Sequence, residues 1–548
     1  MTDWDETVDF LIVGSGGGSM CAALACKDLG KTPLILEKAE KVGGSTAMSG
    51  GILWIPANPL MLKAGVKDSF EQGLAYMNAV IGDKPGSSAA RKRAYLRTGP
   101  KIVQWLQGKG VQFVYCDGWS DYYDELPGGQ PRGRSVGMTL FDVRKLGRWK
   151  DRLRRGPMPF PVQGNEGQRL TLAKRTLDGF LLAMRVGWRM FMVRLFGKEL
   201  AGSGAAIQSW MLSTALKAGV EIRPETPVLD LVVEDGRVAG VLAERQGRPL
   251  RIRARDGVLI NAGGFAHNAE MRRQYGPQPS STAWTHANPG DTGEMIQAAM
   301  RLGAEVRNMD QAIWLVTSLL PDGRRAIHAN ELGKPHLIVV DRRGERFTDE
   351  ACSYMETGQK IYENKAVPCW AIMDGRHRES YNWAKMPPGV NPPDWAASGY
   401  MKRADTLEEL ARKCGVDPAG LKATAERFNG FVAAGEDLDF HRGARAYDRY
   451  WGDPTYKPNP CLGTIEKPPF YAVELYPGDV GTYGGVMTDE NGRVLREDGT
   501  AIEGLYATGN STASVTGVRY PGAGASIGAS FVFGYRAARH AAGVDVDA

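Results

Sequence analysis

A glycine-rich turn near the start of the chain has the residue types that bind a pyrophosphate. Residues 10–19 read FLIVGSGGGS, which predicts a strand that runs into a turn and then a helix. A first glycine permits the tight turn, a second lets backbone N–H groups approach phosphate, and a small residue at the third position allows close helix packing. The candidate residues are Gly14, Gly16, Gly17, Gly18 and, at the third position, Ser19.

An acidic residue follows at the spacing that this turn requires. Glu37 ends the next predicted strand about twenty residues further on, where a carboxylate can bind a ribose 2′-hydroxyl, and Lys38 comes directly after it. With the apolar strand before the turn, this spacing predicts a nucleotide cofactor.

A second glycine-rich turn lies near the other end of the chain. Residues 506–528 read YATGNSTASVTGVRYPGAGASIG, and a closing helix is expected to start near Gly524. Two nucleotide-type turns, in a chain far too long for one mononucleotide unit, predict FAD rather than NAD. The helix N-terminus, with Ala525 and Ile527, should point at the flavin pyrimidine. Gly509 and Asn510, within ATGNSTAS, resemble the late flavoprotein motif that approaches the pyrophosphate and ribityl chain.

Two further loops supply candidate cofactor contacts. The loop KVGGSTAMSGG offers backbone donors and hydroxyls for the pyrophosphate and the flavin ring. Ala262 and Gly263 lie in a strand-to-turn segment that resembles the flavoprotein segment where the backbone nears the dinucleotide. The candidates in the first loop are Gly43, Gly44, Ser45, Thr46, Ser49, Gly50 and Gly51.

The elements that position these turns predict an α/β protein. Strands are expected at 8–13 and 33–37, helices at 18–29, 86–109 and 205–219, and a β-meander after residue 219. Residues 257–265 should return to the cofactor sheet. We predict a Rossmann-like FAD-binding domain with an inserted α+β catalytic domain. Its parts are an FAD-binding domain at 1–138, 201–282 and 466–548, a basic amphipathic insertion at 139–200, and a catalytic domain at 283–465.

Composition places the chain among globular proteins that work in a reducing compartment. Its 548 residues are 43% hydrophobic and 24% charged, with a formal net charge of +6. The seven cysteines have neither metal-ligand spacing nor a disulfide framework, so no metal is expected. We expect a cytoplasmic protein with neither a signal peptide nor the roughly 18 consecutive apolar residues that span a bilayer.

The insertion at 139–200 stands apart from the rest. Its second half reads DGFLLAMRVGWRMFMVRLFGKEL, in which Arg185, Arg189 and Arg194 form a narrow basic stripe on an apolar helix. This helix fits a membrane interface, with peripheral attachment to the inner face of the cell membrane, and the basic run 144–155 favours that interpretation. A helix packed on the protein or in a subunit contact is the alternative. No nucleic-acid motif accompanies the charge.

Several segments together resemble a known family. GSGGGS, GGSTAMSGG, SDYYDELPGG, RFTDEACSY and above all GVRYPGAGASIG are similar to the 3-ketosteroid Δ1-dehydrogenases of the fumarate reductase/succinate dehydrogenase flavoprotein superfamily. The resemblance covers nearly the whole chain except 139–200. Covalent flavoproteins of the succinate dehydrogenase type carry a histidine in the second loop. This chain has none there, so FAD should be bound non-covalently.

The resemblance implies the reaction and its residues. Tyr520 and the backbone N–H of Gly524 match the pair that binds the C3 carbonyl, Tyr354 matches the base that takes the C2 proton, and flavin N5 takes the C1 hydride. Tyr122 matches the tyrosine that hydrogen-bonds the base, although a shift of one position would exchange it with Tyr123. The implied partners are a 3-ketosteroid of the androstenedione or cholestenone type and a quinone or other electron acceptor.

Three alternative functions stay open at this point. A 3-ketosteroid Δ4-(5α)-dehydrogenase would act on a saturated A ring. A reductase of the fumarate or urocanate type would need arginine and histidine donors, and the seven histidines do not cluster with arginine near the late motif. A flavin-free membrane scaffold would contradict the intact cofactor turns.

Overall fold

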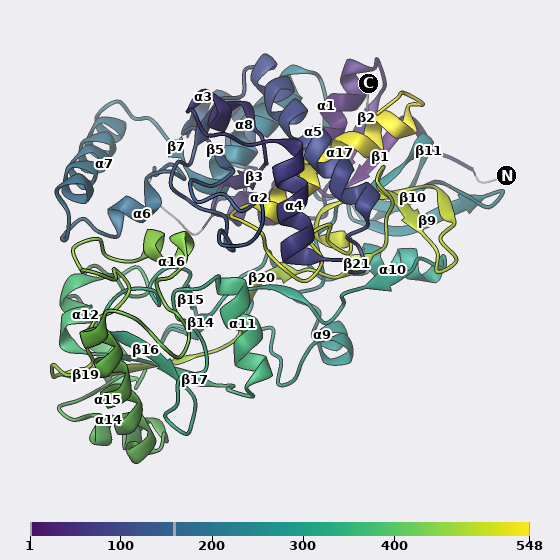
Figure 1. The fold of residues 1–548 in the computed structure, drawn as a ribbon. Coiled ribbons are helices and arrows are strands. Elements are labelled where there is room, and N and C mark those ends of the chain that lie inside the picture. The colour runs from purple at the N-terminus through teal and green to yellow at the C-terminus, as the bar shows by residue number, and fades with distance from the viewer. Residues whose placement is uncertain (1–2, 157–160, 547–548) are drawn as a thin grey trace.

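A mostly parallel sheet forms the centre of the larger domain in this computed structural model, which describes residues 3–156 and 161–546 (Figure 1). Its first strand and the strand after the next helix are parallel neighbours, as the sequence predicted. The strand order is β22 (Arg493–Leu495), β23 (Ala501–Ala507), β11 (Arg248–Ile260), β1 (Glu6–Val13), β2 (Pro33–Leu36) and β8 (Glu221–Arg223), with β22 antiparallel to β23.

The predicted meander is confirmed. β9 (Val228–Glu234) and β10 (Arg237–Arg245) pair antiparallel with each other, and β10 pairs antiparallel with β11. The end of β11 pairs parallel with β1 and with β23, so residues 257–260 return to the cofactor sheet as expected.

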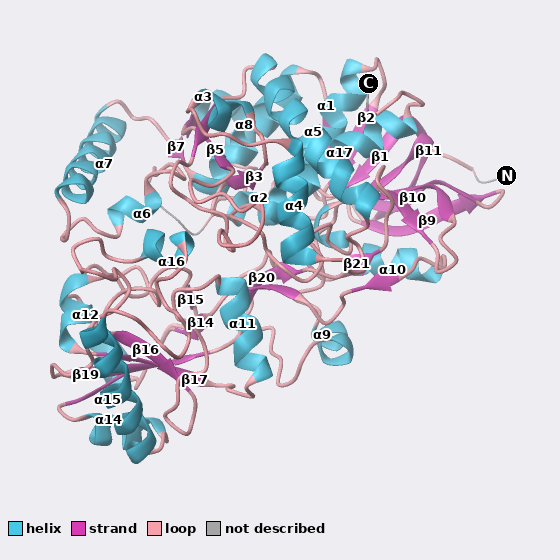
Figure 2. Ribbon diagram, viewed as in Figure 1, coloured by secondary structure: helices cyan, strands magenta, loops and turns pink. Residues whose placement is uncertain are grey.

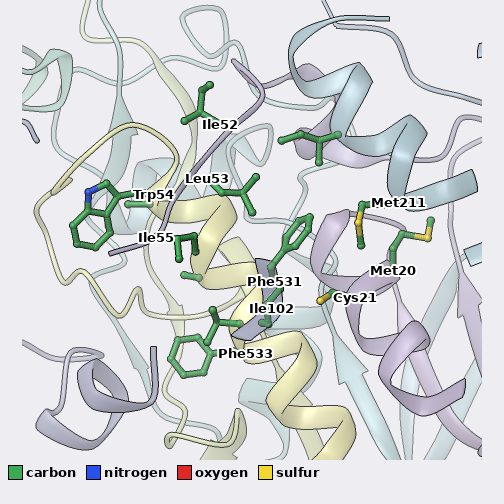
Figure 3. Packing of buried hydrophobic residues seen from close by; sticks show 14 of the residues in the cluster. Met20, Cys21, Ile52, Leu53, Trp54, Ile55, Ile102, Met211, Phe531 and Phe533 are labelled. Atoms are coloured by element: carbon green, nitrogen blue, oxygen red, sulfur yellow. The ribbon is translucent and has the colours of Figure 1, made fainter. Parts of the chain in front are cut away.

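Alternating residues of β1 separate two hydrophobic cores. Phe10 and Ile12 lie in a cluster under the helices of one face, whereas Leu11 and Val13 lie in a cluster on the opposite face. Figure 3 shows part of the first cluster, including Phe531, Phe533, Met20 and Cys21. The helices that contribute to it include α1 (Gly17–Asp28), α5 (Ala89–Gly108), α8 (Ser203–Lys217) and α17 (Ala525–Ala541).

Smaller elements complete the amino-terminal part of this domain. Three short strands of this part form a separate antiparallel sheet. The elements are α2 (Gly44–Met48), β3 (Ile52–Trp54), α3 (Pro59–Lys63), α4 (Phe70–Ile81), β4 (Phe113–Tyr115) and β5 (Ser135–Met138).

The second domain is built on an antiparallel sheet (Figure 2). Leu337 and Val339 face one hydrophobic cluster and Ile338 and Val340 face another, so both sides of this sheet are covered. Its strand order is β16 (Leu337–Val340), β17 (Cys369–Met373), β19 (Phe470–Leu475) and β18 (Met401–Ala404). The helices are α12 (Gly375–Ser380), α13 (Pro393–Ala397), α14 (Leu407–Cys414) and α15 (Pro418–Ala434).

Short elements join the two domains. They include two-stranded pairs and helices that border the cavity described below. The elements are α9 (Ala269–Tyr275), α10 (Glu294–Arg301), α11 (Tyr354–Glu363), α16 (Ala446–Trp451), β12 (Val306–Arg307), β13 (Ala312–Trp314), β14 (Thr317–Leu319), β15 (Arg325–Ile327), β20 (Asp479–Thr482) and β21 (Gly485–Val486).

The packing suggests different domain limits from those predicted. Met295 and Ile296 of α10 belong to the hydrophobic cluster of the large sheet, although the sequence assigned residue 283 onward to the catalytic domain. Conversely, β19 pairs with β17 and β18 in the smaller sheet. We therefore propose that the catalytic domain begins after α10 and ends after β19.

The insertion begins and ends with two short strands that pair with each other, and it contains one long helix. β6 (Phe141–Asp142) and β7 (Leu200–Ala201) pair at its base, and η1 (Val143–Lys150), α6 (Gly167–Leu170) and α7 (Leu177–Leu195) lie between them. Residues 157–160 of this segment lie outside the described residues. In Figure 1, α7 projects from the body of the protein beside the smaller domain. Within the described residues, no helix is both long and apolar enough to cross a bilayer.

Candidate active site

A cavity of about 490 Å³ brings the glycine-rich turns and the three tyrosines together. This volume lies in the usual range of small-molecule sites. The predicted residues that line it are Gly14, Gly16, Glu37, Lys38, Gly44, Ser45, Thr46, Ser49, Gly50, Gly51, Ala262, Gly263, Gly509, Asn510 and Ile527, together with Tyr122, Tyr354, Tyr520 and Gly524.

Five predicted cofactor residues do not line the cavity. Gly17 and Gly18 of α1 pack against Phe531 and Ser530 of α17, where a Cβ atom would stand 2.2 and 2.3 Å from those residues. The Ser19 hydroxyl accepts a hydrogen bond from Asn261. These three residues therefore lie in the contact between helices rather than at the cavity. Gly43 lies against Gln208, and Ala525 is buried in the first turn of α17.

The first turn has little room for any other residue. Gly14 has a φ of +94°, and a Cβ there would stand 2.3 Å from the Asn261 carbonyl oxygen. The glycine therefore lets β1 end directly beside the segment 261–263, so both backbones reach the same end of the cavity.

Glu37 is fixed at the edge of this turn. One of its carboxylate oxygens accepts hydrogen bonds from the Ser15 N–H and hydroxyl, at 3.1 and 2.5 Å, and the other accepts one from the Ala39 N–H. The side chain is buried yet still lines the cavity. A carboxylate held this way is placed to accept ribose hydroxyls as well.

Asp291 is a cavity residue that the sequence analysis missed. Its carboxylate accepts hydrogen bonds from the Ser45 hydroxyl at 3.0 Å and from the Asn288 amide at 3.1 Å. Burial raises the pKa of Asp291 to about 7, although Ser45 and Asn288 oppose this rise. The run NPGDTG at 288–293 could have indicated it, because its glycines resemble those of the other turns.

Two tyrosines from distant segments meet in the cavity wall. The Tyr122 hydroxyl donates a hydrogen bond to the Tyr354 hydroxyl at 3.0 Å, and their ring centroids are 5.5 Å apart. Tyr122 is fully buried, whereas Tyr354 at the start of α11 is partly exposed. The neighbouring Tyr123 instead lies beside the Arg445 guanidinium.

Tyr520 completes the group beside the amino terminus of α17. Its ring centroid lies 6.0 Å from that of Tyr354 and 5.9 Å from that of Tyr122. The Tyr520 hydroxyl bonds the Ser526 hydroxyl at 3.0 Å. The Ser526 N–H also donates to the Tyr520 hydroxyl, at 3.4 Å, and Tyr520 and Gly524 line the same cavity. Burial raises the pKa of Tyr520, and the hydrogen bonds from Ser526 oppose that rise.

Gly524 can take this position only as glycine. Its φ is +90°, and a Cβ there would stand 2.1 Å from the carbonyl oxygen of Ile52. Because Gly524 is the N-cap of α17, the free N–H groups and the positive end of the helix dipole face the cavity.

Backbone contacts hold Tyr122 in register. The Tyr122 N–H and the Tyr76 hydroxyl both donate to the carbonyl oxygen of Pro521, at 3.0 and 2.7 Å. This ties the loop that carries Tyr122 to the residue directly after Tyr520. Asp121 in turn accepts a hydrogen bond from the Trp54 indole at 2.8 Å and forms a buried ion pair with Arg134.

Burial suppresses ionisation of the phenols. It raises the pKa of both Tyr122 and Tyr354 well above 10. The hydrogen bond that Tyr122 donates lowers the pKa of Tyr354 again in part, because it favours the Tyr354 phenolate.

The remaining wall is apolar. Ile313 of β13, Ile327 of β15 and Leu315 just after β13 line it, and Val480 and Trp451 come from later segments. Such a wall suits a hydrophobic ring system. The sequence analysis did not predict these residues for the site.

The residues that line the cavity fit FAD. Two helix amino termini face one cavity, at Gly16 and at Gly524, and both can bind anionic groups. A carboxylate for ribose and close-packed glycine backbones line the same space. No histidine stands in the 43–51 loop, so the residues present would hold FAD without a covalent bond.

Comparisons with known proteins agree with this geometry. Residues 9–527 match a family model described as FAD binding domain. The chain is 41% identical to a 3-oxosteroid 1-dehydrogenase of Mycolicibacterium smegmatis, with 97% of each chain covered. It is 34% identical to a 4-oxocyclohexanecarboxylate 2-dehydrogenase of Sinomonas cyclohexanicum, over 98% of this chain and 93% of that protein.

A solved structure is also similar. It is the 3-ketosteroid Δ1-dehydrogenase of Sterolibacterium denitrificans in complex with 1,4-androstadiene-3,17-dione. The identity is 38%, the TM-score is 0.93, and the match covers 98% of this chain and 100% of that one.

Proposed function

This chain belongs to the FAD-binding family that includes the 3-oxosteroid 1-dehydrogenases, and from that membership we propose that it removes the hydrogens at C1 and C2 of 3-ketosteroids. It is an FAD-dependent oxidoreductase. The observation that carries the proposal is the convergence of Tyr354, Tyr520 and the amino terminus of α17 on one apolar cavity.

The substrate carbonyl is the first requirement. The C2 proton is acidic only because it is α to the C3 carbonyl, so that oxygen must be polarised. The Tyr520 hydroxyl and the Gly524 N–H are the proposed donors to it. One such donor to a developing oxyanion is worth about 2.7–4 kcal/mol in the transition state.

The base is the second requirement. Tyr354 as phenolate would take the C2 proton, and Tyr122 stabilises that phenolate by donating its own hydroxyl proton into the hydrogen bond. The C2–H electron pair then forms the enolate. FAD, when bound, accepts the C1 hydride, which leaves the C1–C2 double bond in the product.

The alternatives have less support. A dicarboxylate reductase would need cationic donors at its substrate, whereas the groups around Tyr354 are phenols. A Δ4-(5α)-dehydrogenase would act on a saturated A ring. A relative that is 41% identical over nearly the whole chain is named a 3-oxosteroid 1-dehydrogenase.

Product analysis separates these functions. The enzyme would be incubated with androst-4-ene-3,17-dione, 5α-androstane-3,17-dione or 4-oxocyclohexanecarboxylate, each with an artificial dye as acceptor. The proposal predicts a 1,4-diene from the first compound. A 4-ene product from the second compound alone would favour Δ4 chemistry, and turnover of the third alone would favour small ring ketones.

We further propose that the insertion docks on an anionic lipid surface. Only Gly179, Leu182 and Val186 of α7 are buried, and Leu182 and Val186 form a small separate cluster with Val162. The opposite side exposes an apolar stripe at helical spacing: Leu177, Leu181, Met184, Trp188, Phe191 and Leu195.

The charges beside this stripe suit phosphate headgroups. Arg185 and Arg194 are exposed on α7, and Lys198 follows it. The predicted three-arginine stripe is incomplete, because Arg189 turns inward and forms an ion pair with Glu166 at 2.7 Å. Much of the basic run 144–155 is also paired, for example Arg144 with Asp142 and Arg152 with Glu225.

Vesicle flotation tests this docking. Replacing Leu181, Trp188 and Phe191 together by serine should abolish flotation with phosphatidylglycerol vesicles while leaving steroid turnover in detergent unchanged. The matched control replaces the exposed Val390 and Leu438 by serine. Flotation that survives the triple substitution would contradict the proposal.

A quinone is the proposed electron acceptor, since docking on a bilayer would bring the enzyme to membrane quinones. Reoxidation of the bleached flavin by a short-chain quinone should be faster than by NAD⁺. Reoxidation by NAD⁺ alone would overturn this assignment.

A further inference from the structure

A buried arginine in the first turn of α5 has no carboxylate to balance its charge. Arg91 is 2% exposed, and its guanidinium donates hydrogen bonds to the carbonyl oxygens of Gly86 and Ala513, the second at 2.8 Å. Among the described residues, no carboxylate forms an ion pair with it. Fully buried arginines are almost always paired, because an unbalanced charge is costly to bury. Nothing in the reaction described so far uses this charge.

Arg91 lies directly behind the wall of the FAD cavity. It borders a second, much smaller cavity of about 10 Å³, which has room for about one water molecule. Gly509, Asn510 and Ser526 line both cavities. These three residues therefore form the wall between Arg91 and the FAD cavity, beside the amino terminus of α17. With so little water in between, the charge is only weakly screened.

The guanidinium of Arg91 keeps its charge at neutral pH. Burial lowers the pKa of Arg91 to about 10, and the negative charge of Asp489 opposes this fall. Asp489 already forms an ion pair with Arg493 at 2.6 Å. The carboxylates that line the FAD cavity are also held by other groups, for example Glu294 by Lys38. The positive charge of Arg91 is therefore left to act on whatever occupies the neighbouring cavity.

A positive charge at this place favours reduction of a flavin. We propose that Arg91 raises the reduction potential of the bound FAD, so that it accepts hydride from a carbon–carbon single bond more readily. The free N–H groups at the amino terminus of α17 already favour negative charge there, and Arg91 adds a full charge behind them. The inference rests on the proposed dehydrogenation.

The balance of the step shows where this charge acts. The C2 proton goes to Tyr354, the C1–H bond breaks, and the hydrogen with its electron pair joins flavin N5. The steroid is oxidised, and the flavin is reduced and gains one negative charge. Arg91 transfers neither a proton nor an electron. It stabilises the reduced, negatively charged flavin relative to the oxidised, neutral one.

The midpoint potential of the flavin tests the inference. The holoenzyme would be reduced slowly beside a reference dye, without steroid, and both absorbances followed. In Arg91→Gln we expect the equilibrium between reduced and oxidised flavin to shift about tenfold toward the oxidised form, which lowers the potential of a two-electron couple by about 30 mV. Sulfite, which adds to flavin N5 and leaves the ring negatively charged, should bind more weakly to the same variant.

Two further variants separate the charge from packing, because Arg91 also ties α5 to the segment at Ala513. Arg91→Lys keeps the charge and should keep a potential close to that of the wild type. Arg91→Met is a second neutral variant, whose side chain can still lie on the Phe533 ring, and it should shift the potential as Arg91→Gln does. The matched control is Arg536→Gln. Arg536 is equally buried and donates to the Thr98 hydroxyl, but it lies about three turns from the amino terminus of α17, so its variant should leave the potential unchanged.

The outcomes divide cleanly. A lower potential in both neutral variants, with Arg91→Lys and Arg536→Gln close to the wild type, would support the proposal. Unchanged potentials in the neutral variants, an equal fall in Arg91→Lys, or loss of FAD from both neutral variants would assign Arg91 to packing and overturn it. Failure of the wild type to form a 1,4-diene would instead remove the proposed function. The potential is measured without steroid, so the two failures are distinguishable.

Discussion

Tyr122 donates a hydrogen bond to Tyr354 over 3.0 Å, although 232 positions of sequence separate the two residues. The direction of this bond matters because a donated proton stabilises a phenolate acceptor. A buried phenol is otherwise seldom ionised, since burial raises the pKa of Tyr354. The pair therefore explains how a tyrosine could remove a carbon-bound proton in an apolar cavity.

Replacing Tyr354 by phenylalanine should abolish exchange of the steroid C2 hydrogens with solvent. The ring packing would be kept and only the base lost. Incubation in D₂O with mass analysis of the recovered steroid measures this exchange. Exchange at the wild-type rate in Tyr354→Phe would assign the base to another group.

Replacing Tyr520 by phenylalanine should lower kcat by roughly 100- to 1000-fold, because one donor to the developing enolate is removed. FAD should remain bound, because Tyr520 lies beside Tyr122 and Tyr354 rather than beside the first glycine-rich turn. Steady-state turnover together with the flavin absorbance of the purified variant checks both parts. Near-normal turnover would remove Tyr520 from the carbonyl site.

Turnover should rise with pH. The active form of Tyr354 is the phenolate, and burial places its pKa above 10, so kcat should increase about tenfold per pH unit below that pKa. In Tyr122→Phe the rising limb should move to still higher pH, because the donor that lowers the pKa of Tyr354 is gone. A flat profile between pH 7 and 10 would contradict a phenolate base.

Gly14→Ala should lower the FAD content of the purified protein. A methyl group there would meet the Asn261 carbonyl oxygen at 2.3 Å, which would push β1 and the segment 261–263 apart. Gly30→Ala is the matched control. Gly30 also has a positive φ, of +71°, but its Cβ would meet nothing within 4 Å. Equal FAD loss in both variants would point to backbone strain rather than to the cradle.

Sequence periodicity was sufficient for the sheet that carries the cofactor turns. The first strand, the helix after Gly16 and the closing helix all lie within one or two residues of their predicted positions, because apolar runs and glycine turns are local features. The cavity-lining glycines of the early turn and the late motif followed from the same local pattern.

Other site features depend on contacts that no local pattern records. The choice between Tyr122 and Tyr123 is made by the Pro521 carbonyl oxygen, which belongs to a segment about 400 residues further along. Asp291 lines the cavity through a contact with Ser45, 246 positions earlier, and Trp451 lines it from a still later segment. Arg189 turns inward because Glu166, in an irregular stretch, offers it a carboxylate.

The most direct test of the central claim is an anaerobic titration of the purified yellow protein with androst-4-ene-3,17-dione, run in parallel on wild type and Tyr354→Phe. The account predicts bleaching of the flavin band with formation of the 1,4-diene in the wild type, and neither in the variant. A wild type that holds FAD but does not bleach would contradict the proposed activity. Bleaching of both proteins at equal rates would contradict the role of Tyr354.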